Sequence, residues 1–446
     1  MTHSGPASGA PSGASAGAPS GETAGAPSGG TAPAPYPIRP VAAEEFDRFH
    51  HVDQHAFHGS PLTAADREVV TAKLEFDRTL AAFDGTELAG TAAAYSFQMS
   101  VPGPDLLPAA GVTWVSVLPT YRRRGVVTSL MHRQLADVAA RGEPLAVLWA
   151  SESAIYSRFG YGRASWYLAL TVHRLEGRLT PAAAASAAGV RLRIAEPADA
   201  LAELAKVHDM VLPSRPGFFA RNDAWWRSTI FDSPEDRDGQ SPLRCLIAED
   251  DSGPRGYALY QGRDRWDDFV PQNVLTVREL IAADAAASAA LYGDLLSRDL
   301  TSEFSLPRRP VDDPLLFQLA DPRRARPQVN DALWVRIVDL PRALAGRSYS
   351  APVDLVLEVR DGILPSNAGR WRLSSAGGDG DAICEPATGP ADLALDITEL
   401  GAAYLGGTRI GTLAEAGLVT ELRSGAVRRL SAAMAWDPAP WCPKVF

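Results

Sequence analysis

Apolar residues in the first half of the chain alternate between strand-like runs and helical spacing. Residues 80–95 hold two apolar runs around an Asp-Gly pair, which predicts a β-hairpin because this pair suits a tight turn between strands. A third strand is predicted at 111–118, and apolar residues then recur at helical spacing over 127–138. Another strand is predicted at 145–150. The order strand, helix, strand predicts a βαβ crossover with parallel pairing.

A looser version of the same scheme follows in the middle of the chain. The predicted elements are a strand at 190–194, a helix at 200–211, a hairpin at 244–260, a strand at 274–280 and a helix at 283–296. The chain therefore contains a second unit built like the first.

The last part of the chain opens with a predicted strand at 333–337 and continues with strands at 355–359 and 370–373. Its end, residues 436–446, holds three prolines and three aromatic residues. Proline removes backbone donors and fixes φ, so this end cannot be helical throughout. We predict an extended tail with hydrophobic anchors, because a frayed end would leave its large apolar side chains in water.

These patterns predict one tail and three folded units. Residues 1–35 consist of Gly, Ser, Ala, Pro and Thr in near-repeats and lack the apolar side chains that would offset the entropy of ordering, so they predict a disordered tail. The predicted units are residues 36–178, 190–332 and 333–446, with an Ala-rich linker between the first two.

Composition and charge narrow the classes of function. The chain is 46% hydrophobic and 22% charged, as is typical of globular proteins, and its net charge of −10 disfavours a nucleic-acid partner. We find neither an apolar run long enough to span a membrane nor a secretory signal, so we expect a cytoplasmic protein with no membrane partner. Three scattered cysteines predict neither a disulfide framework nor a zinc site.

The most informative segment is the basic glycine turn at 122–128, between the predicted strand and helix. A diphosphate is bound well by backbone N–H groups at a helix N-terminus, and Gly125 permits close approach of the backbone. The strand ending at 115–117 would offer backbone groups to the amides of a pantetheine arm. Taken alone, the turn also fits an exposed basic loop that leads into a surface helix. The second unit has neither Gly nor Arg at the corresponding turn, so we expect no coenzyme site there.

This segment resembles motif A of the GCN5-related N-acetyltransferases (GNAT), which matches Arg122 and Gly125 but usually has a small residue where Val127 stands. The departure is shared by the Eis-like (enhanced intracellular survival) branch, which residues 115–125 and 149–162 and the terminal Phe446 also resemble. The resemblance implies an α/β (α+β) fold of two fused GNAT domains followed by a sterol-carrier-protein-like domain. It further implies acetyl-CoA as co-substrate, no metal, and assembly as a homo-hexamer.

The resemblance also implies two catalytic residues. Tyr156 matches the family's general acid, which protonates the departing thiolate, and the terminal carboxylate of Phe446 matches its general base. Tyr161 is a rival acid that spacing alone does not exclude. The coenzyme-binding positions carried over are Val115, Ser116, Val117, Arg122, Arg123, Arg124, Gly125, Val126, Val127, Thr128, Ser151 and Glu152.

Two further features have open interpretations. Trp114 is either a wall of the acceptor pocket or a buried structural residue. The histidines at 50, 51, 55 and 58 lie close together on a predicted helix, which allows a metal cluster, but no carboxylate or cysteine partner is evident, so we favour a place along the acceptor pocket.

Two functions follow as hypotheses. The first is an N-acetyltransferase acting on a primary amine of a small polyamine, an aminoglycoside-like acceptor or a lysine side chain. The alternative is a binding protein whose sterol-carrier-like domain holds an apolar ligand while the GNAT units serve as scaffold. The acceptor itself is not readable from the sequence, because variable loops and helices form acceptor pockets.

Overall fold

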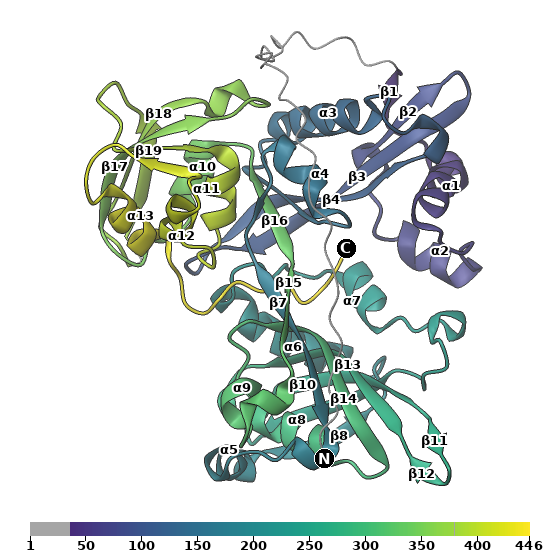
Figure 1. The fold of residues 1–446 in the computed structure, drawn as a ribbon. Coiled ribbons are helices and arrows are strands. Elements are labelled where there is room, and N and C mark those ends of the chain that lie inside the picture. The colour runs from purple at the N-terminus through teal and green to yellow at the C-terminus, as the bar shows by residue number, and fades with distance from the viewer. Residues whose placement is uncertain (1–35, 379) are drawn as a thin grey trace, which may run out of the picture. The chain divides into compact units, whose positions relative to one another are not determined.

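The computed structural model describes residues 36–378 and 380–446, so the predicted tail at 1–35 lies outside the described residues. The first sheet has the strand order β1-β2-β3-β4-β5-β16-β6 (Figure 1). Its strands are β1 (Ile38–Arg39), β2 (Thr79–Asp84), β3 (Glu87–Ser100), β4 (Leu106–Val117), β5 (Leu145–Trp149), β6 (Gly162–Arg163) and β16 (Leu333–Ile337). Its helices are α1 (Phe46–Phe57), α2 (Ala64–Thr71), α3 (Val126–Ala140) and α4 (Ser153–Tyr156).

The local predictions for this sheet are confirmed. Strands β2 and β3 form the antiparallel hairpin around Asp84 and Gly85. Strands β4 and β5 pair in parallel and are joined by α3, as the βαβ pattern predicted. Helices α1 and α3 both pack on β3 and β4, and the apolar side of α1 (Phe46, Phe49 and Val52) is fully buried.

The second sheet has the order β15-β7-β14-β13-β10-β9-β8. Its strands are β7 (Trp166–His173), β8 (Arg191–Ala195), β9 (Arg244–Asp250), β10 (Gly253–Arg263), β13 (Asn273–Ala282), β14 (Thr301–Pro310) and β15 (Gln328–Asp331), and β11 (Trp266–Asp267) pairs with β12 (Val270–Pro271) beside it. The helices of this region are α5 (Pro181–Ser186), α6 (Leu201–Val211), α7 (Asp223–Ile230), α8 (Ala285–Ser297) and α9 (Leu315–Gln318). The predicted hairpin corresponds to the antiparallel pair β9 and β10.

The third sheet has the order β19-β18-β17-β20-β21. Its strands are β17 (Val353–Arg360), β18 (Gly369–Ser375), β19 (Ala382–Pro386), β20 (Leu393–Asp396) and β21 (Val419–Glu421). The helices are α10 (Leu340–Ala345), α11 (Ile397–Ala403), α12 (Ile410–Glu415) and α13 (Ala426–Met434). After α13 the chain runs to Phe446 without a helix, which confirms the predicted extended tail.

Two strands pair with a sheet that belongs mainly to a neighbouring predicted unit. Strand β7 lies within residues 36–178 by sequence, but it pairs with β14 and β15 of the second sheet. Strand β16 opens the predicted third unit, yet it pairs with β5 and β6 of the first sheet. The unit bounds 36–178, 190–332 and 333–446 therefore stay predictions. The first two sheets each contain one strand that comes from a neighbouring predicted unit.

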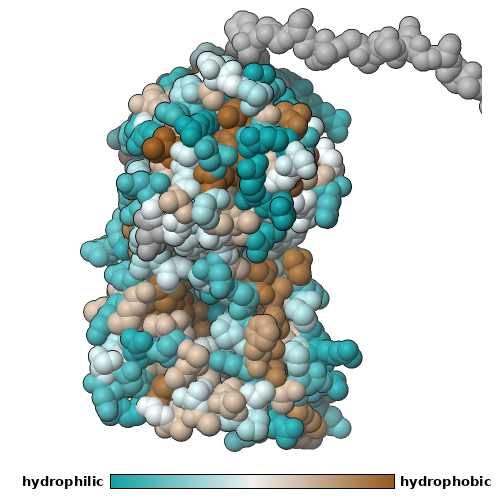
Figure 2. Space-filling view, turned by 90° about the vertical axis from the view of Figure 1, so that its left-hand side faces the viewer, coloured by the Kyte–Doolittle hydropathy of each residue, from teal (hydrophilic) through white to brown (hydrophobic). Residues whose placement is uncertain are grey.

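Surface character varies over the face shown in Figure 2, where hydrophilic and hydrophobic residues are intermixed and brown groups gather just below the middle of the view. Fully exposed apolar side chains on the molecule include Leu175 and Phe269, with exposed fractions of 95% and 93%. Among the described residues, no helix is both long enough and apolar enough to cross a membrane.

Candidate functional site

The site begins where two parallel strands separate. Strands β4 and β5 pair at Ala109–Leu145, Ala110–Ala146 and Gly111–Val147, and the pairing ends there. Next along β4, the register with β3 shifts and Trp114 adopts a left-handed backbone with φ 54°, the geometry of a β-bulge. A bulge bends its strand, so β4 leaves β5 and opens a groove between them.

The groove has a volume of about 260 Å³ and lies where the coenzyme site was predicted. Seven of the predicted coenzyme residues line it, namely Val115, Ser116, Val117, Arg122, Val127, Ser151 and Glu152. Three further lining residues, Ala56, Phe57 and Ile155, escaped the sequence analysis because nothing in their local pattern marks them.

The other predicted coenzyme residues form the turn beside the groove. Gly125 is the N-cap of α3 and has φ 79°, a left-handed conformation that glycine adopts without strain. The next residues, Val126, Val127 and Thr128, start the helix, where the first N–H groups have no acceptor within the helix and point toward its N-terminal end. The side chain of Val126 is buried, so a contribution from this residue is made by its backbone. Arg123 and Arg124 are exposed on the same turn, and the Arg124 guanidinium lies 5.1 Å from the ring centroid of Tyr121.

A second cavity of about 510 Å³ adjoins the groove. Its lining comes from α1, α2 and the segment after it, strands β3, β4 and β5, the segment from β5 through α4, and the chain end. The residues are Asp53, Phe57, Val70, Lys73, Tyr95, Val112, Thr113, Trp114, Val115, Trp149, Ala150, Ser151, Tyr156, Val445 and Phe446. Phe57, Val115, Ser151 and Tyr156 line both the cavity and the groove. The two spaces therefore meet at Tyr156, and Phe446 lies on the cavity side of that junction.

Tyr156 ends the short helix α4 and is 5% exposed. Burial, together with the nearby charge of Glu152, raises the pKa of its phenol to about 12, so the group is protonated at neutral pH. The rival Tyr161 is fully buried, its hydroxyl has no hydrogen-bond partner, and it lines neither the groove nor the cavity. Of the two, Tyr156 alone lines the groove and the cavity.

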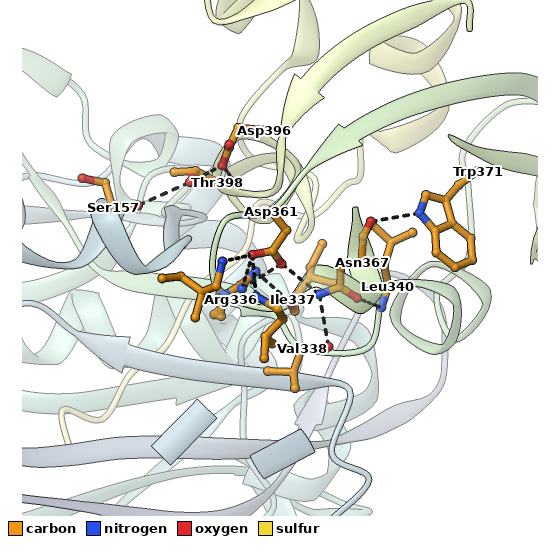
Figure 3. A network of polar contacts seen from close by, with 12 residues as sticks. Ser157, Arg336, Ile337, Val338, Leu340, Asp361, Asn367, Trp371, Asp396 and Thr398 are labelled. Atoms are coloured by element: carbon orange, nitrogen blue, oxygen red, sulfur yellow. Dashed lines mark hydrogen bonds and ion pairs between the residues drawn. The ribbon is translucent and has the colours of Figure 1, made fainter. Parts of the chain in front are cut away.

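The turn after Tyr156 rests on a buried polar network from β16 and the segment after β17 (Figure 3). The guanidinium of Arg336, fully buried, donates to both carboxylate oxygens of Asp361 at 2.8 Å. The side chain of Asn367 donates to the same carboxylate at 3.0 Å. Gly160 has φ 81°, and a β-carbon there would meet the Arg336 guanidinium at 2.8 Å. The Arg336 side chain therefore packs directly under the turn that carries the tyrosine.

Helix α11 supports the same turn from the third sheet. The hydroxyl of Thr398 donates to the Ser157 carbonyl at 3.4 Å, and the backbone of this helix fills the space where a side chain at Gly162 would stand. The last part of the chain thus positions a site that lies in the first sheet.

Replacing Asp361 with Asn is expected to destabilise the fold by about 3–5 kcal/mol, because it leaves the charge of Arg336 buried without its partner. The measurement is the midpoint of urea unfolding. Asp354→Asn is the matched control, since Asp354 pairs with Arg372 at 2.9 Å on the surface and its loss is expected to cost at most about 1 kcal/mol. Equal shifts in the two variants would contradict a structural role for the buried pair.

The C-terminal tail is fixed by contacts with the second sheet region. Trp441 is 4% exposed, packs on Phe218 with 5.4 Å between ring centroids, and its backbone N–H donates to the Pro216 carbonyl at 2.9 Å. The Ala439 N–H donates to the Asp312 carboxylate at 2.9 Å. These contacts direct the chain end toward the first sheet.

Phe446 itself packs into an aromatic cluster beside the cavity. Its ring lies 4.9 Å from that of Phe97 and 5.4 Å from that of Phe219, both in edge-on contact. The neighbouring Lys444 donates to the Ser228 carbonyl at 3.2 Å. The last residue is therefore held by its side chain at the cavity wall.

The helix that carries the histidines contributes other residues to the cavity. Asp53 and Phe57 line it, whereas the four histidines are not among its lining residues, and their place along the acceptor pocket stays a prediction. The rings of His51 and His55 lie 4.4 Å apart on the outer face of α1. Among the described residues, no group of three or more His, Cys, Asp or Glu is arranged to hold a metal ion.

Trp114 combines the two roles left open for it. It lines the cavity, and its indole N–H donates to the Tyr95 hydroxyl at 3.3 Å while its ring packs on Phe49 at 5.7 Å. Nearby, the Ser116 hydroxyl donates to the Asp53 carboxylate at 2.8 Å. Burial raises the pKa of Asp53 above its ordinary value, and the serine bond opposes this shift.

Family models match three segments of the chain. Two models described as acetyltransferase (GNAT) domains match residues 37–164 and 217–337, and a sterol carrier protein domain matches 340–443. These matches confirm the predicted fold class of two GNAT domains followed by a sterol-carrier-like domain.

Similar proteins extend over most of the chain. An uncharacterised N-acetyltransferase of Streptomyces coelicolor is 44% identical over 412 residues, which cover 92% of this chain and 99% of that protein. N-acetyltransferase Eis of Mycobacterium tuberculosis is 36% identical over 361 residues, covering 79% and 84%. The crystal structure of Eis1 from Mycobacterium abscessus has a TM-score of 0.78 and 34% identity, covering 92% of this chain and 100% of that one. The chain belongs to the Eis-like family of GCN5-related N-acetyltransferases, which are acetyl-CoA-dependent enzymes.

Proposed function

We propose that this enzyme transfers the acetyl group of acetyl-CoA to a primary amine of a small polyamine, an aminoglycoside-like acceptor or a lysine side chain. The observation that carries the proposal is the junction of the two spaces. Tyr156 lines both the groove and the cavity, and Phe446 lines the cavity beside it. A thioester in the groove would thus meet an amine in the cavity between these two residues.

The carboxylate of Phe446 is the proposed general base. An α-carboxyl group has a pKa of about 3.5, so it is ionised at neutral pH and can accept a proton from an ammonium, directly or through water. The freed amine attacks the thioester carbonyl. The aromatic contacts of Phe446 hold the chain end in place, which reduces the entropy cost of bringing base and acceptor together.

Tyr156 is the proposed general acid. As the carbon–sulfur bond breaks, the sulfur takes up the electron pair and needs a proton, which the phenol supplies. Because burial and Glu152 raise its pKa to about 12, the phenol carries that proton throughout the physiological pH range.

The donor groups along the groove support its assignment to the coenzyme. The first N–H groups of α3 and the side chain of Arg122 would hold the diphosphate, since helix N-termini and guanidinium groups both favour phosphate. The backbone of residues 115–117 would receive the pantetheine amides where β4 has left β5. Bound there, the coenzyme supplies the activated acetyl thioester.

The cavity charges suit a cationic acceptor. Asp53 and the C-terminal residue Phe446 both line it, together with one basic residue, Lys73. We further propose a homo-hexamer in the cytoplasm, which the family resemblance implies, and a reaction without a metal.

The carrier alternative gains no support from the surface groove on α12 and α13, because charged residues such as Arg409, Glu415 and Arg428 line it.

The test is thiol release from acetyl-CoA in the presence of separate primary amines: a linear polyamine, an aminoglycoside and a lysine-containing peptide. At least one amine is expected to raise thiol release far above the rate with acetyl-CoA alone, with an acetylated product of matching mass. Release that no amine accelerates would contradict the proposed transfer.

A further inference from the structure

Lysine is scarce in this chain and unevenly placed. The 43 basic residues include three lysines, Lys73, Lys206 and Lys444. Lys206 is exposed on α6 beside the second sheet. The other two meet at a single residue near the acceptor cavity, because both donate to Ser228.

Lys73 lies two residues after the end of α2 and lines the same cavity as Tyr156 and Phe446. Its ammonium donates to the Ser228 hydroxyl at 2.8 Å and lies 4.7 Å from the ring centroid of Trp225. Within residues 36–378 and 380–446, no carboxylate lies within ion-pair distance of it. A primary-amine side chain without a carboxylate partner among the described residues therefore lines the space proposed to receive acceptor amines, with its nitrogen resting on Ser228.

The surroundings of Lys73 favour the neutral, nucleophilic amine. Burial lowers its pKa to about 8. Lys444, whose pKa is lowered to about 7 by burial and by neighbouring cations that include Lys73, donates to the carbonyl of the same Ser228. Two like charges held on one residue disfavour simultaneous protonation. A sizeable fraction of Lys73 is then unprotonated at mildly alkaline pH.

We propose that Lys73 is a self-acetylation site, at which the enzyme transfers an acetyl group from acetyl-CoA to its own acceptor cavity. The inference rests on the proposed function, since it uses the same thioester and the same acid. The neutral Lys73 nitrogen attacks the thioester carbonyl and a carbon–nitrogen bond forms. The carbon–sulfur bond breaks, and the sulfur keeps its electron pair and takes a proton from Tyr156. The nitrogen gives one proton to the proposed base, the Phe446 carboxylate, directly or through water, and an amide remains.

The position of Lys73 makes it the preferred lysine. Lys444 does not line the cavity, whereas Lys73 does. Lys206 belongs to the second unit, away from the residues that line the groove. Acetylation of Lys73 removes one positive charge from the wall of a cavity that also presents Asp53 and the chain end. The modified enzyme would then present a more acidic cavity to a cationic acceptor.

The experiment incubates the purified full-length enzyme with acetyl-CoA and no acceptor, then follows acetylation of each lysine by peptide mass spectrometry. Cleavage after arginine isolates Lys73 in the peptide between Arg67 and Arg78. Lys73 is expected to gain an acetyl group at least about 100-fold faster than Lys206, because enzymatic acid–base catalysis operates only inside the cavity. Tyr156→Phe and a saturating amine acceptor should each slow the labelling, and Lys73→Arg should abolish it at this peptide while retaining the charge.

Two results overturn the inference in distinguishable ways. If a small amine is acetylated while Lys73 stays unmodified, or gains acetyl no faster than Lys206, self-acetylation is wrong and the proposed function stands. If neither the small amine nor Lys73 is acetylated, the proposed function fails as well.

Discussion

A chain extended by one residue after Phe446 is expected to lose about 10²–10⁴-fold in kcat, the usual contribution of a general base. The extension keeps the Phe446 ring between Phe97 and Phe219 but converts its carboxylate into a peptide bond. The new chain end then lies one residue farther along. Thiol release with a saturating amine measures the loss, and the KM for acetyl-CoA should change little because the groove is untouched.

Phe446→Leu is the matched control for the extension. It removes the aromatic contacts but keeps the terminal carboxylate at the same chain position. We expect it to lose much less kcat than the extended chain. The reverse order, with the extension active and the leucine variant inactive, would assign the chain end a packing role instead of a proton-transfer role.

Replacing Tyr156 with Phe is expected to lower kcat by about 10²–10⁴-fold, because the thiolate must then leave without a proton donor. Tyr161→Phe is the matched control. Its hydroxyl is buried without a hydrogen-bond partner, so removing it should leave kcat nearly unchanged. Equal losses in the two variants, or none in Tyr156→Phe, would show that the phenol is not the acid.

The pH dependence of the parent enzyme bears on the same assignment. A general acid works only while protonated, so its contribution is present below its pKa and lost above it. Since the pKa of Tyr156 is raised to about 12, kcat should show no loss caused by this group until the pH approaches that value. A fall near pH 10, the ordinary range of tyrosine, would instead indicate a solvated phenol.

Local sequence patterns were sufficient to predict the elements that carry the coenzyme groove. The Asp84-Gly85 turn, the helical spacing of α3 and the apolar run of β5 depend on residues within a few positions of one another. Their conformations are fixed by short-range preferences, so a single sequence was enough. Of the seven groove residues carried over from the resemblance, three lie on β4, Arg122 and Val127 lie at the turn and start of α3, and Ser151 and Glu152 follow β5.

The exchange of β7 and β16 between sheets could not be predicted from the sequence, because it depends on pairing between residues that are far apart in the chain. Leu333 pairs with Trp149 in β5, and the intervening residues build the entire second sheet. An apolar strand such as β16 is compatible with either neighbouring sheet. Its place is decided by the Arg336–Asp361 pair and the turn at Gly160, contacts that no local pattern encodes.

The cavity proposed for the acceptor could not be predicted from the sequence, for the same reason. Asp53, Lys73, Tyr95 and Trp149 come from four separate segments, and each residue looks ordinary in its own context. The aromatic residues of the tail did predict a buried end through their apolar character. The sequence patterns did not show where that end would lie. The expectation that it lies at the catalytic site came from the family resemblance.

Preparing the enzyme with its last carboxylate as a carboxamide tests the central claim most directly, because the chain length and the Phe446 side chain stay the same. Cys442 permits ligation of a synthetic peptide of residues 442–446 that ends in the amide. We predict that kcat falls about 10²–10⁴-fold relative to a chain ligated with the free acid. An undiminished kcat in the carboxamide enzyme would contradict the assignment of the Phe446 carboxylate as the base.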